Sequence, residues 1–368
     1  MTGPGSERTE RTRIGGPFPF TRRPRVVRRL LHAALLLVVL LAGPACTPVV
    51  MPAGPPTAMP GLREDAILTS DGVALPLRRF APSGQTRVVL LALHGFNDHS
   101  GNFLTDSLER FGAAGVMIYA YDQRGFGRAP NRGYWAGAET LAADAAEAAR
   151  LLRRRHPDRP FFLLGESMGA AVAVLAGARD GAPPVDGYIL LAPAIWSREA
   201  MNPFMRGGLW LAARTIPMMG LQGGVGGIVA SDNVDALRRL GRDPLTIRTT
   251  RVDAALGLVD LMDMAVDALP RCCRGASGQR APTLALIGAQ DMIVPSRATR
   301  RALRPLPEGA RPRIAVYPQG FHLLLSDRNR DVVMGDILGF IAAPAAPLPS
   351  GAEANTADWL EGRLTPGS

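Results

Sequence analysis

The sequence predicts an α/β domain with a mainly parallel, doubly wound sheet and a helical cap. Beyond residue 62, runs with strand character alternate regularly with runs of helical character, which is typical of an α/β domain. Several of the strand runs are continuously apolar, as expected of strands that helices cover on both faces. Residues 196–270 break the alternation because they hold no strand-like run, so they predict an insertion.

The first half of the domain begins with a hairpin. Residues 66–80 contain an Asp-Gly pair between two strand-like runs, which favours a tight turn. Residues 87–95 and 116–125 predict the next two strands. Residues 103–115 predict the helix between them, because apolar residues recur at helical spacing and a glycine ends the run.

The second half continues the pattern. Residues 138–156 predict an alanine-rich helix whose acids come early and whose arginines come late, which suits the helix dipole. Residues 159–165 predict a buried strand, and a helix follows from Ser167. Three more apolar runs predict strands at residues 185–195, 281–291 and 311–320.

Three segments lie outside this pattern. We interpret residues 196–270 as a helical cap over the carboxyl edge of the sheet, inserted after the sixth strand. Residues 47–61 are rich in proline and predict a tether between the N-terminal segment and the domain. The domain itself is expected to span residues 62–342, and the Pro/Ala-rich residues 343–368 predict a loose tail.

The net charge of +10 does not indicate a nucleic-acid partner. Residues 1–45 hold eight arginines against two glutamates, so +6 of that charge belongs to the N-terminal segment. The remaining charge forms no long basic block, and the chain has no lysine. We therefore expect no nucleic-acid binding. Three cysteines and five scattered histidines match no zinc pattern, so we expect no metal and no other cofactor.

Residues 1–46 predict an export segment. Arginines precede an apolar run from Leu30 to Ala42, and a run of about 13 residues is too short to span a bilayer comfortably but fits a signal peptide. The segment resembles a bacterial lipoprotein signal with Cys46 as the lipidated residue, although Gly43 and Pro44 depart from the usual pattern. An ordinary cleaved signal and an uncleaved anchor remain alternatives. The lipoprotein reading places the domain in the bacterial envelope, membrane-anchored and facing the periplasm.

Ser167 is the candidate nucleophile. It lies in "GESMG", between a buried strand and a helix, where flanking glycines permit the sharp turn that a nucleophile elbow needs. The motif alone is weak evidence in a chain with 41 glycines, so it needs partners. A serine hydroxyl needs a base, and that base needs an orienting acid.

Counting the remaining candidates selects the partners. Only His322 follows Ser167 in the chain, and it comes directly after the last predicted strand. Asp291 alone among the intervening aspartates follows a clean apolar strand, which brings it to the same edge of the sheet. Asp263 and Asp267 remain alternatives for the acid. The backbone N–H groups of Met168 and Phe96 are the expected oxyanion donors.

A set of motifs then gives a resemblance to a known family. "LALHGFNDHSGNF", "AYDQRGFGRAPNRG", "LLGESMGA", "GRDPL" and "AQDMIVP…YPQGFH" occur in the order and spacing of the monoacylglycerol lipase/lysophospholipase group of α/β-hydrolases. The likeness covers about residues 62–342. It implies an α/β-hydrolase fold with a cap, Ser167, Asp291 and His322 as the triad, and Phe96 and Met168 as oxyanion donors. Phe126 departs from the family, where many members have histidine.

The resemblance predicts a serine esterase or lipase that cleaves carboxylic esters of single-chain lipids. Cap residues including Phe204, Trp210 and Met218 are candidates for the wall of an acyl channel, although ordinary packing of the cap would use the same residue types. Other readings remain open: a small-substrate esterase, an aminopeptidase or an acyltransferase with the same triad, and a non-catalytic envelope binding protein. The sequence gives no indication of the oligomeric state.

Overall fold

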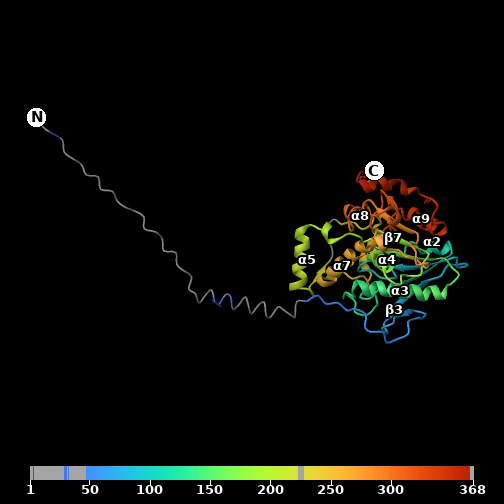
Figure 1. Ribbon diagram of the computed structural model, residues 1–368, viewed down its shortest axis with the longest axis horizontal. Helices are drawn as coiled ribbons and strands as arrows, with labels where there is room; N and C mark the ends of the chain where they lie inside the picture. Colours follow the sequence, from blue (N-terminus) through green and yellow to red (C-terminus); the bar gives the residue numbers. More distant parts are fainter. Residues whose placement is uncertain (1–2, 4–28, 31, 33–46, 223–227, 365–368) are drawn as a thin grey trace. The chain divides into compact units, whose positions relative to one another are not determined.

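A computed structural model describes residues 3, 29–30, 32, 47–222 and 228–364. The chain divides into two units, Met1–Ala45 and Cys46–Ser368, and every element below belongs to the second (Figure 1). The predicted signal segment and Cys46 lie outside the described residues, apart from isolated positions before residue 33. No helix within the described ranges is long and apolar enough to cross a membrane.

The domain is built on a sheet that has nine strands within its described part, in the order β1-β2-β3-β5-β4-β6-β7-β10-β11. The strands are β1 Gly61–Leu62, β2 Ala66–Leu68, β3 Ala74–Phe80, β4 Val88–Leu93, β5 Val116–Tyr121, β6 Phe161–Glu166, β7 Gly187–Leu191, β10 Thr283–Gly288 and β11 Arg313–Tyr317. Strands β5, β4, β6, β7, β10 and β11 pair in parallel, whereas β1 to β3 pair antiparallel at one edge. The predicted α/β-hydrolase fold is confirmed.

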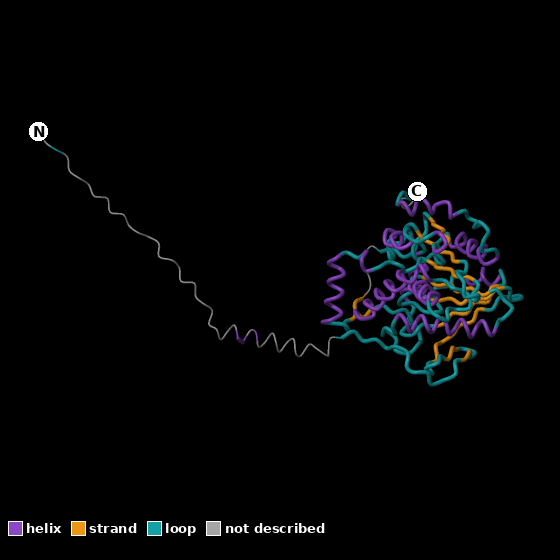
Figure 2. The backbone as a smooth tube through the Cα atoms, viewed as in Figure 1, coloured by secondary structure: helices purple, strands orange, loops and turns teal. Residues whose placement is uncertain are grey.

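Helices cover both faces of the sheet (Figure 2). One apolar layer joins the sheet to α3 Ala138–Arg155, α4 Met168–Ala178, α7 Val252–Ala268 and α8 Ser296–Leu303. The other layer joins it to α2 Leu108–Ala113 and α9 Arg330–Ala342. Burial on both faces explains why β4, β6, β7 and β10 read as continuous apolar runs in the sequence.

The insertion after β7 corrects one detail of the sequence analysis. It contains the helices α5 Pro203–Thr215 and α6 Val234–Arg242 and the whole of α7, as expected. It also contains the short strands β8 Gly220–Gln222 and β9 Thr249–Arg251, which pair antiparallel. The expectation of no strand in residues 196–270 is therefore wrong, because a three-residue pair is too short to give an alternating pattern.

The C-terminal segment is folded onto the domain as far as residue 364, so it is not a loose tail there. It forms a short 3-10 helix at Ala352–Asn355 and the helix α10 Thr356–Glu361. Trp359 is buried, and Thr356 Oγ1 donates a hydrogen bond to Ile314 O on β11 at 2.6 Å. This segment thus completes the layer beside the last strand of the sheet.

The proline-rich residues 47–61 do not form a free tether either. Val50 forms a β-bridge with Trp135, and Met51 N donates to Trp135 O at 2.8 Å. Ala53 N donates to Thr140 Oγ1 at 3.2 Å. Hydrogen bonds from its backbone N–H groups hold the segment extended along the domain. The residue types of the segment do not predict these bonds.

Candidate active site

Ser167 sits at a strained turn between β6 and α4. Its φ of 53° and ψ of −113° are unusual for a residue with a side chain. Its neighbours must be glycines, because a Cβ on Gly165 would lie 2.3 Å from Gly169 O and one on Gly169 would lie 2.3 Å from Leu93 O. The strain turns the hydroxyl out of the strand at the head of α4, as a nucleophile elbow requires.

His322 and Asp291 form a hydrogen-bonded pair that faces the same cavity as Ser167. His322 Nδ1 donates to Asp291 Oδ2 at 2.7 Å. The other carboxylate oxygen of Asp291 accepts hydrogen bonds from Ile293 N and Val294 N, at 2.8 and 2.9 Å. These bonds fix the acid and the ring, and they leave Nε2 of His322 as the nitrogen able to accept a proton from a serine.

The two alternative acids, Asp263 and Asp267, lie in the cap, away from His322. Asp263 accepts hydrogen bonds from Arg198 N at 2.7 Å and from the Arg198 side chain, so its carboxylate serves an ion pair. Asp267 is exposed near the end of α7. Only Asp291 among the three contacts the histidine.

The loop after β4 brings Phe96 beside the elbow. A Cβ on Gly95 would lie 3.4 Å from Ser167 Cβ, so the loop passes directly over the nucleophile. Phe96 lines the same cavity as Ser167. Met168 is the first residue of α4, where a helix leaves its backbone N–H groups without an intrahelical partner. Both residues predicted as oxyanion donors are therefore next to Ser167.

Three polar residues that the sequence analysis did not single out hold this loop. His94 is fully buried, which lowers its pKa to about 4 and keeps the ring neutral. Its Nε2 accepts from Gln123 N at 3.0 Å, so Nδ1 carries the proton and donates to Gly95 O at 2.8 Å. His99 Nε2 donates to Asp243 Oδ2 at 3.0 Å and so joins the loop to the cap. The motifs "HGFNDHS" and "GRDPL" contain these residues, and pairing the two motifs would have found the contact.

A second joint links the cap to the loop of His322. His322 N and Leu323 N both donate to Ala230 O, at 3.1 and 2.9 Å. One residue further along the cap, Ser231 Oγ donates to Asp327 Oδ1 at 2.6 Å, while Asp327 Oδ2 accepts from Phe321 N at 2.8 Å. Asp327 is completely buried. It therefore joins the cap to the histidine loop, and we call this joint the Asp327 clamp.

The Asp327 clamp predicts a pH dependence of stability. Burial raises the pKa of Asp327 from 3.8 to about 6, against hydrogen bonds from Ser231 and Phe321 that lower it. Between these values the folded state holds a proton that the unfolded state has lost. This contribution to stability is complete below about pH 4 and is lost as the pH rises through about 6.

Asp327→Asn cannot titrate, so it lacks that loss. We therefore compare the free energy of unfolding of the variant with that of the parent. The difference, variant minus parent, is expected to rise by on the order of 2 kcal/mol between about pH 4 and pH 7. Urea unfolding across this range measures the difference. Asp235→Asn is the matched control, because Asp235 is exposed on α6. Parallel curves for Asp327→Asn and the parent would contradict the prediction.

The cavity at Ser167 and His322 has a volume of about 300 Å³. Most of its lining is apolar. The loop after β7 contributes Trp196, α7 contributes Leu258 and Met262, and the loop of Asp291 contributes Ile293 and Val294. Thr246 also lines the cavity, and its Oγ1 is buried without a hydrogen-bond partner among the described residues. The cavity thus offers a largely apolar wall beside Ser167.

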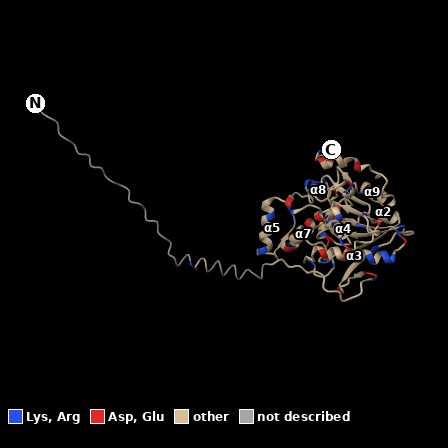
Figure 3. Cartoon of the chain, in the orientation of Figure 1, with Lys and Arg blue, Asp and Glu red and all other residues tan. Residues whose placement is uncertain are grey.

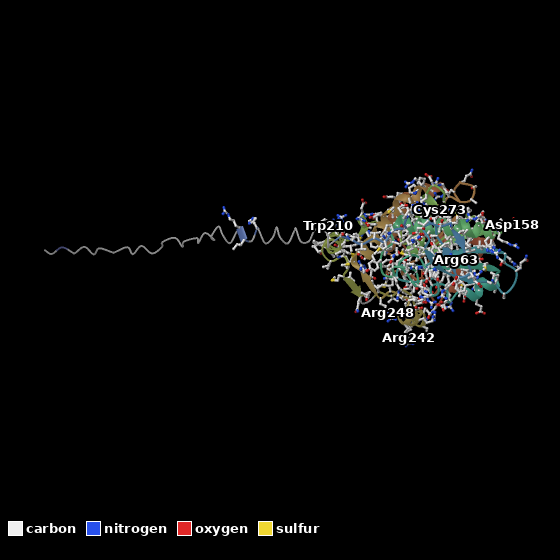
Figure 4. The ribbon with its side chains drawn as sticks, turned by 90° about the horizontal axis from the view of Figure 1, so that it is seen from below. Arg63, Asp158, Trp210, Arg242, Arg248 and Cys273 are labelled. Carbon is white, nitrogen blue, oxygen red and sulfur yellow. The ribbon has the colours of Figure 1, made fainter. Side chains whose placement is uncertain are left out.

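The cap residues predicted to line an acyl channel do not lie in this cavity. Phe204, Trp210 and Met218 are 89%, 53% and 59% exposed. Trp210 lies at the outer edge of the domain (Figure 4) and lines a separate hollow between α5 and α7. The prediction of these three residues is wrong, because α7 lines the cavity and neither α5 nor Met218 does.

Among the residues that the structure describes, no group of histidine, cysteine, aspartate and glutamate side chains could hold a metal ion. Cys272 and Cys273 are buried free thiols after α7.

The nucleophile elbow, the histidine–aspartate pair and the sheet together define a serine hydrolase of the α/β-hydrolase fold. The family model described as "Serine aminopeptidase, S33" (Hydrolase_4) matches residues 84–329, and the chain belongs to this family. It is related to lipases and esterases within it.

The most informative relatives are monoacylglycerol lipases. The chain is 24% identical over 281 residues to the monoacylglycerol lipase of Mycolicibacterium smegmatis, covering 74% of this chain and 94% of that protein. It is 25% identical over 263 residues to human monoglyceride lipase, covering 70% and 82%.

Two solved structures share the fold. The Paleococcus ferrophilus monoacylglycerol lipase has a TM-score of 0.58 at 22% identity, over 73% of this chain and 98% of that one. A soluble variant of the Saccharomyces cerevisiae monoglyceride lipase has a TM-score of 0.61 at 18% identity, over 80% and 98%.

Proposed function

We propose that this protein hydrolyses carboxylic esters of single-chain lipids through an acyl-enzyme on Ser167. The observation that carries the proposal is the small apolar cavity that opens directly on Ser167 and His322. At about 300 Å³ it lies at the lower end of the range for ligand pockets, which suits one acyl chain better than two. The printed names of the relatives, monoacylglycerol lipase and monoglyceride lipase, agree with this substrate class.

The residues take the following roles in this mechanism. His322 Nε2 takes the proton of Ser167 as the hydroxyl attacks the ester carbonyl, and Asp291 holds the ring and stabilises the imidazolium. The N–H groups of Phe96 and Met168 stabilise the oxyanion of the tetrahedral intermediate. The imidazolium then protonates the leaving alcohol. A water molecule repeats the sequence and releases the fatty acid from Ser167.

A substrate panel with a nucleophile variant tests the proposal. Wild-type protein is expected to be labelled by a fluorophosphonate and to hydrolyse monoacylglycerol, lysophospholipid and p-nitrophenyl acyl esters, whereas Ser167→Ala loses both labelling and turnover. Ser100→Ala is the control, because Ser100 is a buried serine bonded to Asp122. Labelling without ester turnover, but with turnover of aminoacyl amides, would favour the aminopeptidase alternative. Absence of labelling in the wild type would favour a binding protein.

A substitution in the cavity wall predicts a change in chain-length preference. Leu258→Trp places a larger side chain in the cavity beside Ser167, so substrates with long acyl chains should clash. We expect the ratio of kcat/KM for long over short p-nitrophenyl esters to fall about ten-fold or more. Phe204→Ala is the control, since the exposed Phe204 lies outside the cavity and its loss should leave the ratio unchanged. A shift in the control alone would contradict this assignment of the acyl pocket.

We also propose that residues 1–46 export the protein and hold it at the bacterial envelope membrane, with Cys46 as the lipidated residue. The basic residues followed by a short apolar run support this. Mass spectrometry of the N-terminal peptide from the exporting cell tests it, because an acylated Cys46, an unmodified cleaved terminus and an intact N-terminus differ in mass.

A further inference from the structure

A second hollow of the domain, apart from the catalytic cavity, is lined by three arginines. They are Arg132, from the loop that precedes α3, and Arg242 and Arg248, from the cap. The hollow has a volume of about 560 Å³. Figure 4 shows Arg242 and Arg248 near one another at one edge of the domain. We call this hollow, with its three arginines, the arginine hollow.

The protein does not neutralise the charge of the arginine hollow. Basic and acidic residues are interspersed over most of the domain (Figure 3), but the described lining of this hollow includes no aspartate or glutamate. No ion pair within the described ranges involves one of its three arginines. Asp243 follows Arg242 in the chain, but its two carboxylate oxygens accept from His99 Nε2 at 3.0 Å and from Leu245 N at 2.8 Å. The hollow therefore presents positive charge that a bound anion would neutralise.

Backbone oxygens hold two of the three guanidinium groups. Arg132 Nη2 donates to Pro244 O at 2.7 Å, and Arg248 Nη2 donates to Asp243 O at 3.4 Å. A guanidinium group has five N–H donors, so these bonds leave donors for a ligand. Guanidinium groups held in this way suit phosphate, because two oxygens of a phosphate can accept the paired N–H groups of one arginine.

The arginine hollow adjoins the catalytic cavity. Thr246 lines both of them, and Asn97 of the cavity holds the next cap residue, because Asn97 O accepts from Ile247 N at 2.9 Å. The Thr246 hydroxyl is buried and has no hydrogen-bond partner in the part of the chain that the structure describes. A buried hydroxyl of this kind needs a water molecule or a ligand as its partner. A substrate that extends from Ser167 into the hollow would pass beside this residue.

We propose that the arginine hollow binds the phosphate of the substrate's head group, and that the preferred substrate is a lysophospholipid whose head group has a net negative charge. The inference rests on the proposed function, because it places the acyl chain in the cavity at Ser167. In a lysophospholipid a short glycerol backbone separates the ester from the phosphate, just as Thr246 separates the cavity from the hollow. The alcohol that leaves when Ser167 is acylated then carries the phosphate, and water releases the fatty acid.

The lining of the arginine hollow discriminates between single-chain lipids. A monoacylglycerol has no anion to offer to the arginines. A lysophosphatidylcholine carries a quaternary ammonium group, for which the described lining provides neither a carboxylate nor an aromatic ring. A lysophosphatidylglycerol keeps its net negative charge. We therefore expect kcat/KM for lysophosphatidylglycerol to exceed the values for the other two lipids.

Turnover by the full chain tests this preference, with the three lipids at one short acyl-chain length and below their critical micelle concentrations. In the wild type we expect kcat/KM for lysophosphatidylglycerol to exceed that for monoacylglycerol about ten-fold or more. Combining Arg242→Gln with Arg248→Gln should lower this ratio about ten-fold or more, mainly through KM. A wild-type ratio of one or less, or an equal ratio in the double variant, would overturn the proposal.

Arg154→Gln is the matched control for the turnover experiment. Arg154 is exposed in the last turn of α3, and it does not line the arginine hollow. Its replacement removes the same charge from the surface, so the ratio should stay at the wild-type value. A fall in the control equal to that in the double variant would show an effect of net charge and would overturn the assignment to the hollow.

Binding to Ser167→Ala measures head-group recognition without catalysis. Calorimetry is expected to show an affinity for lysophosphatidylglycerol that weakens with added salt and falls about ten-fold or more when Arg242→Gln and Arg248→Gln are added. Equal affinity for inorganic phosphate would indicate a site for free phosphate. Loss of binding to phosphatidylglycerol vesicles, with unchanged affinity for the monomeric lipid, would indicate a membrane contact. Either result would overturn the proposal. If no ester is turned over but the expected binding is found, the proposed function fails and the head-group site stands.

Discussion

Asp291→Asn is expected to lower kcat for ester hydrolysis about 10⁴-fold while the protein stays folded. The reason lies in the bonds that fix this carboxylate. One oxygen accepts from Ile293 N and Val294 N, and an asparagine would keep its only oxygen there. Its amide NH₂ would then face His322 Nδ1, which forces the proton onto Nε2. A histidine in that tautomer cannot take the proton from Ser167.

Asp263→Asn is the matched control for this prediction. Both aspartates follow Ser167 in the chain, and the sequence left both open as the acid of the triad. Because Asp263 bonds Arg198 rather than the histidine, its replacement should leave kcat within about two-fold of wild type. Steady-state rates with a p-nitrophenyl ester and urea unfolding measure both variants. A large loss in Asp263→Asn with none in Asp291→Asn would reverse the assignment.

The cap is joined to both halves of the catalytic machinery. On one side, Asn97 Nδ2 donates to Thr250 Oγ1 at 2.7 Å, and Asn97 O accepts from Ile247 N at 2.9 Å. On the other side, Ala230 O accepts from the backbone of the His322 loop. The loop expected to donate to the oxyanion and the loop of the base thus share the cap as a common support. A movement of the cap would therefore shift both loops.

The strand pattern of the sequence selects Ser167, His322 and Asp291 as the candidate trio, because each of them follows a strand of a parallel sheet. A buried strand produces a continuous apolar run, and its end marks the edge where side chains meet. One histidine downstream of Ser167 and one aspartate after a clean strand then left little choice. The same logic cannot find Asp327 or His99, whose roles depend on contacts between loops far apart in the chain.

The errors of the sequence analysis share a physical cause. An apolar residue in a helical pattern predicts burial, but it does not show which neighbouring element buries the side chain. The sequence therefore predicts Phe204 and Trp210 in the cavity, although α7 contributes to its wall and α5 does not. It predicts a tether for the proline-rich residues 47–61, because backbone hydrogen bonds to the domain leave no trace in side-chain types. It predicts a loose tail for residues 343–368, although Trp359 is buried and α10 lies beside β11.

The elbow glycines give the largest expected effect on stability. In Gly169→Ala, the new Cβ would lie 2.3 Å from Leu93 O and 2.8 Å from His94 O, both backbone atoms of the neighbouring strand and loop. Neither oxygen can move without shifting β4 or the loop of Phe96. We expect a loss of about 4 kcal/mol or more in the free energy of unfolding, together with loss of fluorophosphonate labelling at Ser167.

Gly208→Ala makes the same chemical change but is expected to raise the free energy of unfolding. Gly208 lies inside α5, and nothing lies within 4 Å of its added Cβ. Alanine is the better helix former, so this variant should gain up to about 1 kcal/mol where Gly169→Ala loses several. Urea unfolding of the two variants beside wild type measures both. If Gly169→Ala unfolded at the wild-type midpoint and kept its labelling, the close approach of α4 to β4 would not be what forms the elbow.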